Sequence, residues 1–171
     1  MKLSFIGMSG AGKSYWAQKL SGTFHVIGID DMIAKKLGLA DVGSVASWMG
    51  WPDEPGYRER EQRYLECEVS SMNEALDEIQ ASEENIILDT SGSVVYMSEA
   101  ICDRMKSLTS VTYFEDTDEA LLQRYLSNPK PLIWGDQFDQ LPGESASHAV
   151  VRCYPRLIAY RKNLYERLAG K

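Results

Sequence analysis

The pattern of apolar and polar positions predicts strands that alternate with helices along the chain. Four short apolar runs have the length of buried parallel strands, at residues 2–6, 24–29, 85–89 and 110–115. Segments with helical spacing of apolar residues lie between and after them, at residues 13–21, 30–38, 56–80, 97–108, 117–126 and 145–168. This order indicates an α/β fold built on a parallel sheet, in which ligands bind at the carboxyl ends of the strands.

Single residues within the predicted helices give more specific expectations. In helix 13–21 one apolar stripe is expected from Tyr15, Trp16 and Leu20. In helix 56–80 the side chains expected to face inward are Tyr57, Tyr64, Leu65, Val69, Met72, Leu76 and Ile79. Pro155 lies near the middle of the last helix, where a kink or break is expected.

Local signals also mark the ends of helices and the loops. Gly38 is a plausible C-cap, Thr117 a plausible N-cap, and Asp30 and Asp31 begin a helix. Residues 39–54 mix glycine, tryptophan and proline and are expected to form a loop or short turns. Residues 127–143 are expected to be irregular.

Composition and charge exclude several classes of function. The 171 residues suffice for one domain with a real core, and the composition is that of an ordinary globular protein. A net charge of −7 without a long basic run makes a nucleic-acid partner unexpected. No apolar stretch approaches membrane length, and the three cysteines are widely spaced and odd in number. We therefore expect a cytoplasmic protein with reduced thiols and no membrane partner.

The segment GMSGAGKS at residues 7–14 matches the pattern of a phosphate-binding loop. Its glycines, Gly7, Gly10 and Gly12, allow the backbone to curl so that N–H groups point at phosphate oxygens. Lys13 can then reach the β- and γ-phosphates, and the Ser14 hydroxyl can bind Mg²⁺. Ala11 and Tyr15 complete the expected nucleotide site. The order strand, glycine loop, helix favours this interpretation over an ordinary turn with a surface lysine, and predicts binding of ATP with Mg²⁺.

Two further polar groups follow predicted strands. Asp30, with Asp31 beside it, follows the second strand, and Asp89 ends the third and precedes residues 90–93. Strand ends of a parallel sheet meet at one edge, so these groups and the glycine loop predict a single site. Asp89 occupies the position from which a carboxylate contacts Mg²⁺ through water. The alternatives are that Asp30 only caps a helix and Asp89 only a turn.

Five segments in order resemble the shikimate kinases, within the wider group of small P-loop kinases. They are IDDMIAKKLG, YRERE at residues 57–61, DTSGSV, KPL at Lys130, and RKNLY near the end. The family has D-x-D, F-R-x-x-E, G-G-G, R-P-L and R-x-P-L-Y in those places, and the resemblance covers most of the chain. It implies a single domain, residues 1–171, with the three-layer P-loop NTPase fold. The parallel sheet would have four or five strands in the order 2-3-1-4.

The resemblance also implies roles for individual residues. Asp30 would hold the accepting hydroxyl of the substrate, while Arg58 and Arg161 would clamp its carboxylate. Gly92 would lie against the substrate ring. Lys130 would be the lid cation over the phosphates, and Arg124 would lie near adenine. The acceptor-binding region would span about residues 30–65 and the lid about residues 127–145, in a protein that is expected to be a monomer.

The chain departs from the family pattern at several positions. Gly28 replaces the first acid of D-x-D, serines at 91 and 93 flank Gly92 in place of glycines, and Lys130 replaces an arginine. The segment WPDE widens the loop before Arg58, and a fifth edge strand is missing from the pattern. These changes bear on the acceptor more than on the type of reaction.

The sequence thus predicts a kinase that transfers the γ-phosphoryl group of ATP to a hydroxyl of a small carboxylic acid, with shikimate the leading candidate. Two alternatives remain at this stage. One is another P-loop kinase, acting on a sugar acid, nucleoside or nucleotide, and the other is a nucleotide-binding module with weak hydrolysis. Arg58 and Lys130 also have simpler interpretations as solvated surface charges. Three loop tryptophans could wall an acceptor or pack over the core, namely Trp48, Trp51 and Trp134.

Overall fold

A four-stranded parallel sheet lies at the centre of the protein, in a computed structural model that describes residues 1–128 and 130–170. Pro129, in the predicted lid, and Lys171, at the end of the predicted domain, lie outside the described residues. The strands are β1 (Lys2–Ile6), β2 (His25–Gly28), β3 (Ile86–Asp89) and β4 (Ser110–Tyr113). Their order is β2-β3-β1-β4, which confirms the predicted sheet; no fifth strand occurs within the described residues.

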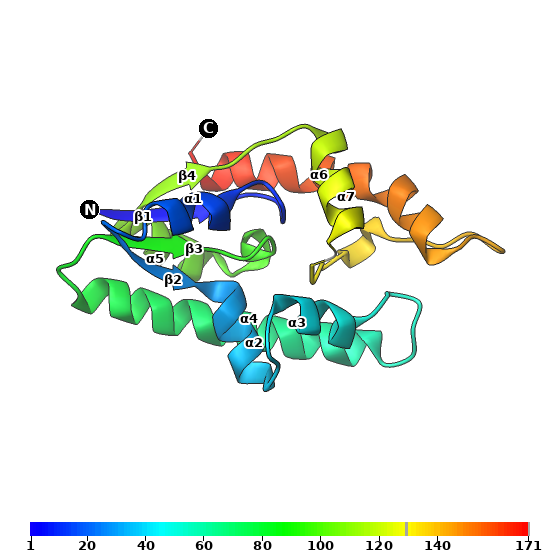
Figure 1. Cartoon of the computed structure of the whole chain (residues 1–171), viewed down its shortest axis with the longest axis horizontal. Coiled ribbons are helices and arrows are strands. Elements are labelled where there is room, and N and C mark those ends of the chain that lie inside the picture. Colours follow the sequence, from blue (N-terminus) through cyan, green and yellow to red (C-terminus); the bar gives the residue numbers. More distant parts are fainter. Residues whose placement is uncertain (129, 171) are drawn as a thin grey trace.

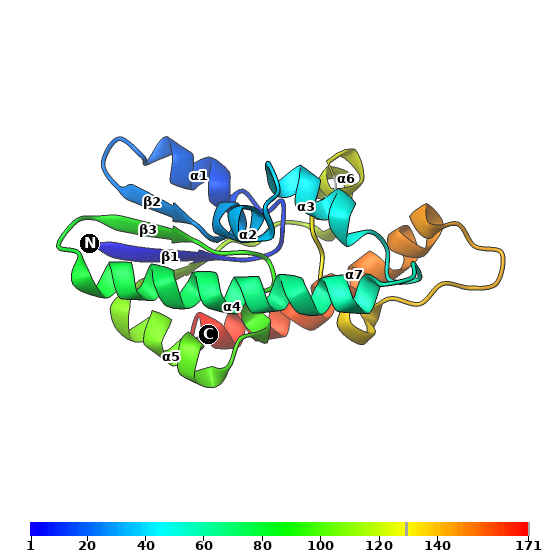
Figure 2. The same ribbon diagram turned by 90° about the horizontal axis from the view of Figure 1, so that it is seen from below.

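The helices form layers on both faces of this sheet. They are α1 (Lys13–Lys19), α2 (Ile29–Leu37), α3 (Val42–Met49), α4 (Tyr57–Ala81), α5 (Glu99–Leu108), α6 (Asp118–Ser127) and α7 (Ala146–Leu168), with 3-10 turns η1 (Val94–Tyr96) and η2 (Gly135–Gln137). Figure 2 shows α1 on one side of the strands, and α4 and α5 on the other. The predicted three-layer arrangement is therefore present.

The burial of the strands explains why the layers form. In β3 all three residues before Asp89 are fully buried, because side chains on both faces of a parallel sheet are covered. Phe5 and Ile87 pack with Ala17 of α1, whereas Ile6, Ile86 and Leu88 join the larger core under α4 and α7. The register pairs Asp89 with Phe5 on one side and with Gly28 on the other. The carboxyl ends of β1, β2 and β3 therefore lie together, and Figure 1 shows them pointing toward the region between α2, α3 and α6.

The expectation of a loop at residues 39–54 was wrong, because α3 forms there. The side chain of Asp41 accepts a hydrogen bond from the Ser44 backbone N–H at 2.7 Å and caps the helix. Val45 and Met49, one turn apart, are both buried against the core. A cap and two apolar residues are thus enough to fold a short helix whose flanking glycines and tryptophans concealed it.

Two predictions about buried faces were also wrong. Tyr15 and Trp16 are 60% and 52% exposed, and Leu20 is exposed as well, because the small side chain of Ala17 faces the sheet instead. Val69 of α4 is 39% exposed, while the neighbouring Glu68 is buried.

The ends of the helices agree better with the sequence. Gly38 is the C-cap of α2 with a φ of 71°, and the Thr117 side chain accepts a hydrogen bond from the backbone N–H of Ala120. Helix α7 continues through Pro155 without the break that was one of the two expectations. None of the helices in the described part of the chain is long and apolar enough to cross a membrane.

Candidate active site

The glycine loop between β1 and α1 adopts a backbone that only glycine accommodates easily. Gly7, Gly10 and Gly12 have φ values of 141°, 84° and 96°. A Cβ atom at Gly7 would lie 2.4 Å from the carbonyl oxygen of Phe114, so any other residue would clash there. The shape of the loop therefore depends on its own glycines and on Phe114, the residue that follows β4.

Lys13 lies inside this loop and is almost completely buried. Its ammonium group donates hydrogen bonds to the carbonyl oxygens of Gly7 at 2.8 Å and Met8 at 3.1 Å. Burial lowers its pKa, and the carboxylates of Asp89 and Asp30 oppose that shift. The loop thus holds a cation in place through carbonyl oxygens, and Lys13 has no ion pair within the described part of the chain.

Three strand ends contribute polar groups to one cavity of about 380 Å³. It is lined by Lys13 and Ser14 from the glycine loop, by Asp30 from α2 and by Asp89 from β3, with Lys130 on another side. The prediction that these separate sequence motifs meet at one place is borne out by this geometry. Gly12 and Tyr15 also line this cavity.

Asp30 is the carboxyl group best suited to proton transfer in this cavity. Burial raises its pKa to about 6; Lys13 lowers it, and Asp89 raises it further. A carboxyl group with such a pKa is ionised near neutral pH and still basic enough to accept a proton. Asp31, beside it, is exposed.

Asp89 and Ser14 fit the binding of a magnesium ion. The Oδ1 atom of Asp89 is buried without a hydrogen-bond partner in the described residues, and burial raises the pKa of the group. A hydrogen bond from Ser14 opposes that shift, so hydroxyl and carboxylate are adjacent. No group of three acidic, histidine or cysteine side chains suited to a metal occurs among residues 1–128 and 130–170. Mg²⁺ commonly takes few protein ligands beside substrate phosphates.

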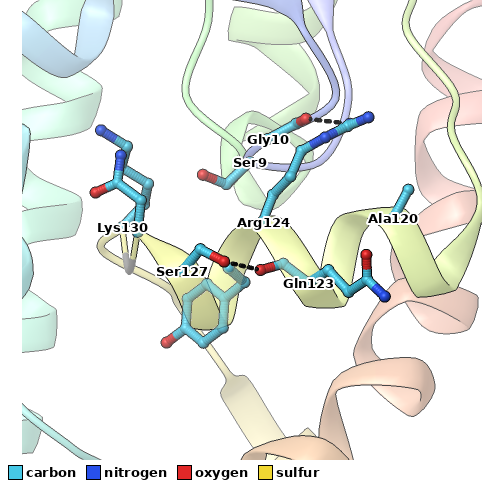
Figure 3. A pocket seen from close by; sticks show the side chains of 9 residues that line it. Ser9, Gly10, Ala120, Gln123, Arg124, Ser127 and Lys130 are labelled. Atoms are coloured by element: carbon cyan, nitrogen blue, oxygen red, sulfur yellow. Dashed lines mark hydrogen bonds between the residues drawn. The ribbon is translucent and has the colours of Figure 1, made fainter.

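A second cavity, of about 540 Å³, opens beside the glycine loop along α6 (Figure 3). Its lining includes Ser9, Gly10, Gln123, Arg124 and Lys130. Arg124 donates to the Gly10 carbonyl at 2.7 Å and to Asp116 at 2.6 Å, and so ties α6 to the loop. The predicted position of Arg124 near the nucleotide is compatible with this cavity. Ser9 lies within the predicted loop, residues 7–14, whereas Gln123 carried no signal in the sequence.

A third cavity, of about 510 Å³, lies between α3 and the segment that follows α6. Its walls include Met49, Trp51, Glu54 and Trp134, again with Lys130. Lys130 therefore borders all three cavities, where they approach one another. Trp51 and Trp134 line this cavity, but all three loop tryptophans also pack with the core, Trp134 as a buried member and Trp48 and Trp51 against it.

Arg161 is fully buried, and its guanidinium group is occupied by protein oxygens. It donates to the hydroxyl of Tyr96 at 3.1 Å and to the carbonyls of Gly92 at 2.8 Å and Ile133 at 2.5 Å. Gly92 lies close to both this group and the glycine loop, since a Cβ atom on it would be 3.1 Å from the Ser9 nitrogen. Arg161 thus joins α7 to the site from within the core.

Arg58 lies elsewhere. Its side chain is 72% exposed and pairs with Glu61 at 3.3 Å. It borders a separate cavity of about 250 Å³ together with Tyr57, Asp53 and Asp139. The structure therefore does not bring Arg58 and Arg161 to one point, and their shared role stays a prediction.

Most of the predicted lid, residues 127–145, is attached to the body of the protein. Residues 132–134 are buried. Arg152 of α7 pairs with Asp139 at 3.0 Å and with Glu144 at 2.8 Å. Lid closure, and the role of Lys130 in it, also stays a prediction.

The comparisons with known proteins can be set against this geometry. No protein-family profile matches the chain. It is 31% identical over 167 residues to the shikimate kinase of Francisella tularensis subsp. holarctica, which covers 96% of this chain and 79% of the relative. The shikimate kinase of Francisella tularensis subsp. novicida gives the same identity and coverage. The chain belongs to the shikimate kinase family.

Solved structures of the family share the fold. A shikimate kinase from Acinetobacter baumannii in complex with shikimate superposes with a TM-score of 0.62 at 21% identity, covering 98% of this chain and 79% of that one. The shikimate kinase from Aquifex aeolicus gives a TM-score of 0.62 at 16% identity, covering 98% and 83%. These matches support the three-layer fold, and membership of the shikimate kinase family rests on the curated relatives.

Proposed function

We propose that this protein transfers the γ-phosphoryl group of ATP to a hydroxyl of a small carboxylic acid, with shikimate as the leading acceptor. The observation that carries the proposal is the meeting of three cavities at Lys130, next to Asp30 and the glycine loop. The cavity along α6 would hold the nucleoside, the central cavity the phosphates and the cavity beside α3 the acceptor. Membership of the shikimate kinase family supports the choice of acceptor.

In the proposed reaction an acceptor oxygen attacks the γ-phosphorus, the bond from that phosphorus to the bridging oxygen of ADP breaks, and Asp30 takes the hydroxyl proton. Lys13 would leave the carbonyls of Gly7 and Met8 to neutralise charge on the β- and γ-phosphates. Lys130 would approach from the opposite side and help to exclude water. Positioning and charge neutralisation supply most of the rate increase in such reactions.

Ser14 and Asp89 would hold Mg²⁺. The ion supplies charge neutralisation at the β- and γ-phosphate oxygens. The unpartnered Oδ1 atom of Asp89 beside Ser14 is the observation that supports this assignment. Gly28, in the position of the family's first acid, leaves Asp89 as the carboxylate nearest to the loop hydroxyl.

The carboxylate of the acceptor would be bound by Arg161 and Arg58 after a local change. The guanidinium group of Arg161 already donates to the Gly92 carbonyl, and a carboxylate can replace a carbonyl as its acceptor. Arg58 is exposed, and within residues 1–128 and 130–170 its ion pair is with Glu61, so its side chain can turn at little energetic cost.

The proposal includes a monomeric protein in the cytoplasm that has no nucleic-acid partner. The three cysteines are free, as is usual in a reducing compartment. The acidic net charge of −7 supports the absence of a nucleic-acid partner.

Coupled measurement of ADP release with a panel of acceptors tests the proposed function. Shikimate should stimulate ADP release strongly, while neutral sugars and nucleosides should not. Stimulation by nucleosides or neutral sugars alone would contradict the carboxylic-acid acceptor. Slow ADP release that no acceptor stimulates would indicate a nucleotide-binding module instead.

A further inference from the structure

Glu68 is a buried carboxyl group beside the site that the proposed reaction does not use. It lies on α4 and is 1% exposed. Its Oε1 atom accepts hydrogen bonds from the hydroxyls of Ser91 and, at 2.6 Å, Ser93. Both serines are also buried. Because an unpartnered carboxyl group is costly to bury, these two hydrogen bonds fix the position of the segment on which the serines lie.

That segment, residues 91–93, is the place where α4, α7 and the glycine loop meet. Between the two serines, the carbonyl of Gly92 accepts hydrogen bonds from Arg161 at 2.8 Å and from the Tyr165 hydroxyl at 2.5 Å. On its other side Gly92 lies against Ser9, with no room for a Cβ atom without displacement. A shift of residues 91–93 would therefore move both the guanidinium group of Arg161 and Ser9, which lines the proposed nucleotide cavity.

We propose that Glu68 is a positioning residue for the kinase reaction, which holds residues 91–93 through both serine hydroxyls and thereby sets the acceptor site against the glycine loop. The proposal rests on the proposed function for its kinetic consequences, but the structural role does not depend on the identity of the acceptor. It also gives a physical reason for the two serines, since an all-glycine segment would leave the buried carboxyl group without these donors.

The role of Glu68 depends on its ability to accept hydrogen bonds and does not require that the group be charged. Burial raises its pKa to about 7, and the hydrogen bonds from Ser91 and Ser93 oppose that shift. Asp30 of α2 raises the pKa further, and Arg161 of α7 lowers it. Near neutral pH the group exists in both protonation states, and in both of them an oxygen can accept from the serines. Glutamine keeps one such oxygen, so the Glu68→Gln variant should hold residues 91–93 as the parent protein does.

The test compares Glu68→Leu with Glu68→Gln in the full-length protein. Glu68→Leu should raise the KM for shikimate about tenfold and leave the KM for ATP within about twofold. It should also speed amide hydrogen exchange at residues 91–93, measured without any acceptor. Glu68→Gln should keep the parent values of both quantities. Met72 is fully buried one turn further along α4, and Met72→Ala is the control for lost stability. This variant should lower the melting temperature without changing either KM.

The exchange measurement separates this proposal from the proposed function. If the parent enzyme shows no turnover with shikimate, the proposed function fails, and faster exchange in Glu68→Leu still supports the positioning role. Unchanged exchange in a folded Glu68→Leu protein would overturn the proposal. If that variant does not fold, Ser93→Ala removes one of the two hydrogen bonds and should raise exchange at residues 91–93; unchanged exchange there would equally overturn it.

Discussion

At the scale of single residues, Asp30 is the proposed proton acceptor, and its surroundings would set the pH range of the reaction. Burial raises its pKa to about 6, so the carboxylate form needed to accept a proton is lost below that pH. We predict that kcat/KM falls on the acid side with an apparent pKa of about 6. A rate profile measured at saturating Mg²⁺ checks this; a flat profile down to pH 5 would contradict the role of Asp30.

Asp30→Asn should separate activity from stability. Loss of the base should lower kcat by about 10²–10⁴-fold. A carboxyl group whose pKa is raised in the folded state favours folding below its ordinary pKa of 3.8 and loses that contribution as pH rises through about 6. The amide does not titrate, so the variant should be more stable than the parent at pH 8 and equally stable near pH 4. Denaturant unfolding at both values measures the difference.

Asp89→Asn tests the metal site. The substitution removes the negative charge of the carboxylate, whose Oδ1 atom lacks a hydrogen-bond partner in the described structure, and it keeps the size of the side chain. We predict a several-fold higher Mg²⁺ concentration for half-maximal activity and little change in the acceptor KM. Mg²⁺ titration of turnover decides between this role and simple capping of the turn after β3, for which the Mg²⁺ dependence would stay the same.

At the scale of elements, α3 forms a wall of the proposed acceptor cavity and depends on its cap. Asp41→Ala removes the hydrogen bond to the Ser44 N–H and should lower stability by about 1 kcal/mol. Because Met49 at the end of α3 lines the cavity, the KM for the acceptor should rise while that for ATP stays constant. Asp41→Asn, which keeps a capping oxygen, should behave like the parent. An increase in both KM values would show that α3 does not act on the acceptor site selectively.

The elements that could be predicted from the sequence are those whose apolar residues are buried within the parallel sheet. All four strands were predicted from short apolar runs, and the run is clearest in β3, where the three residues before Asp89 are fully buried. Helix α3 was missed because its signal is only a cap and two buried residues. The stripe on α1 was placed wrongly because Ala17, the smallest residue of the helix, is the one that packs on the sheet.

At the scale of the whole molecule, the candidate site was predictable where residues follow directly from strand ends. Lys13, Asp30 and Asp89 meet in one cavity because the parallel register places their strand ends together. The positions of Arg58 and Arg161 depend on how α4 and α7 pack, which no local pattern specifies. The buried Glu68 had a weak signal, since it lies one turn from both Tyr64 and Met72 on the inward face of α4.

The proposed reaction moves a phosphoryl group from ATP to shikimate. Phosphorus NMR of a mixture of protein, ATP, Mg²⁺ and shikimate tests it most directly, with Lys13→Ala as the control that keeps the fold but lacks the loop cation. We predict a phosphate monoester signal that appears together with ADP, and a rate at least about a hundredfold lower in the control. ADP with only inorganic phosphate, or equal ester formation by Lys13→Ala, would contradict it.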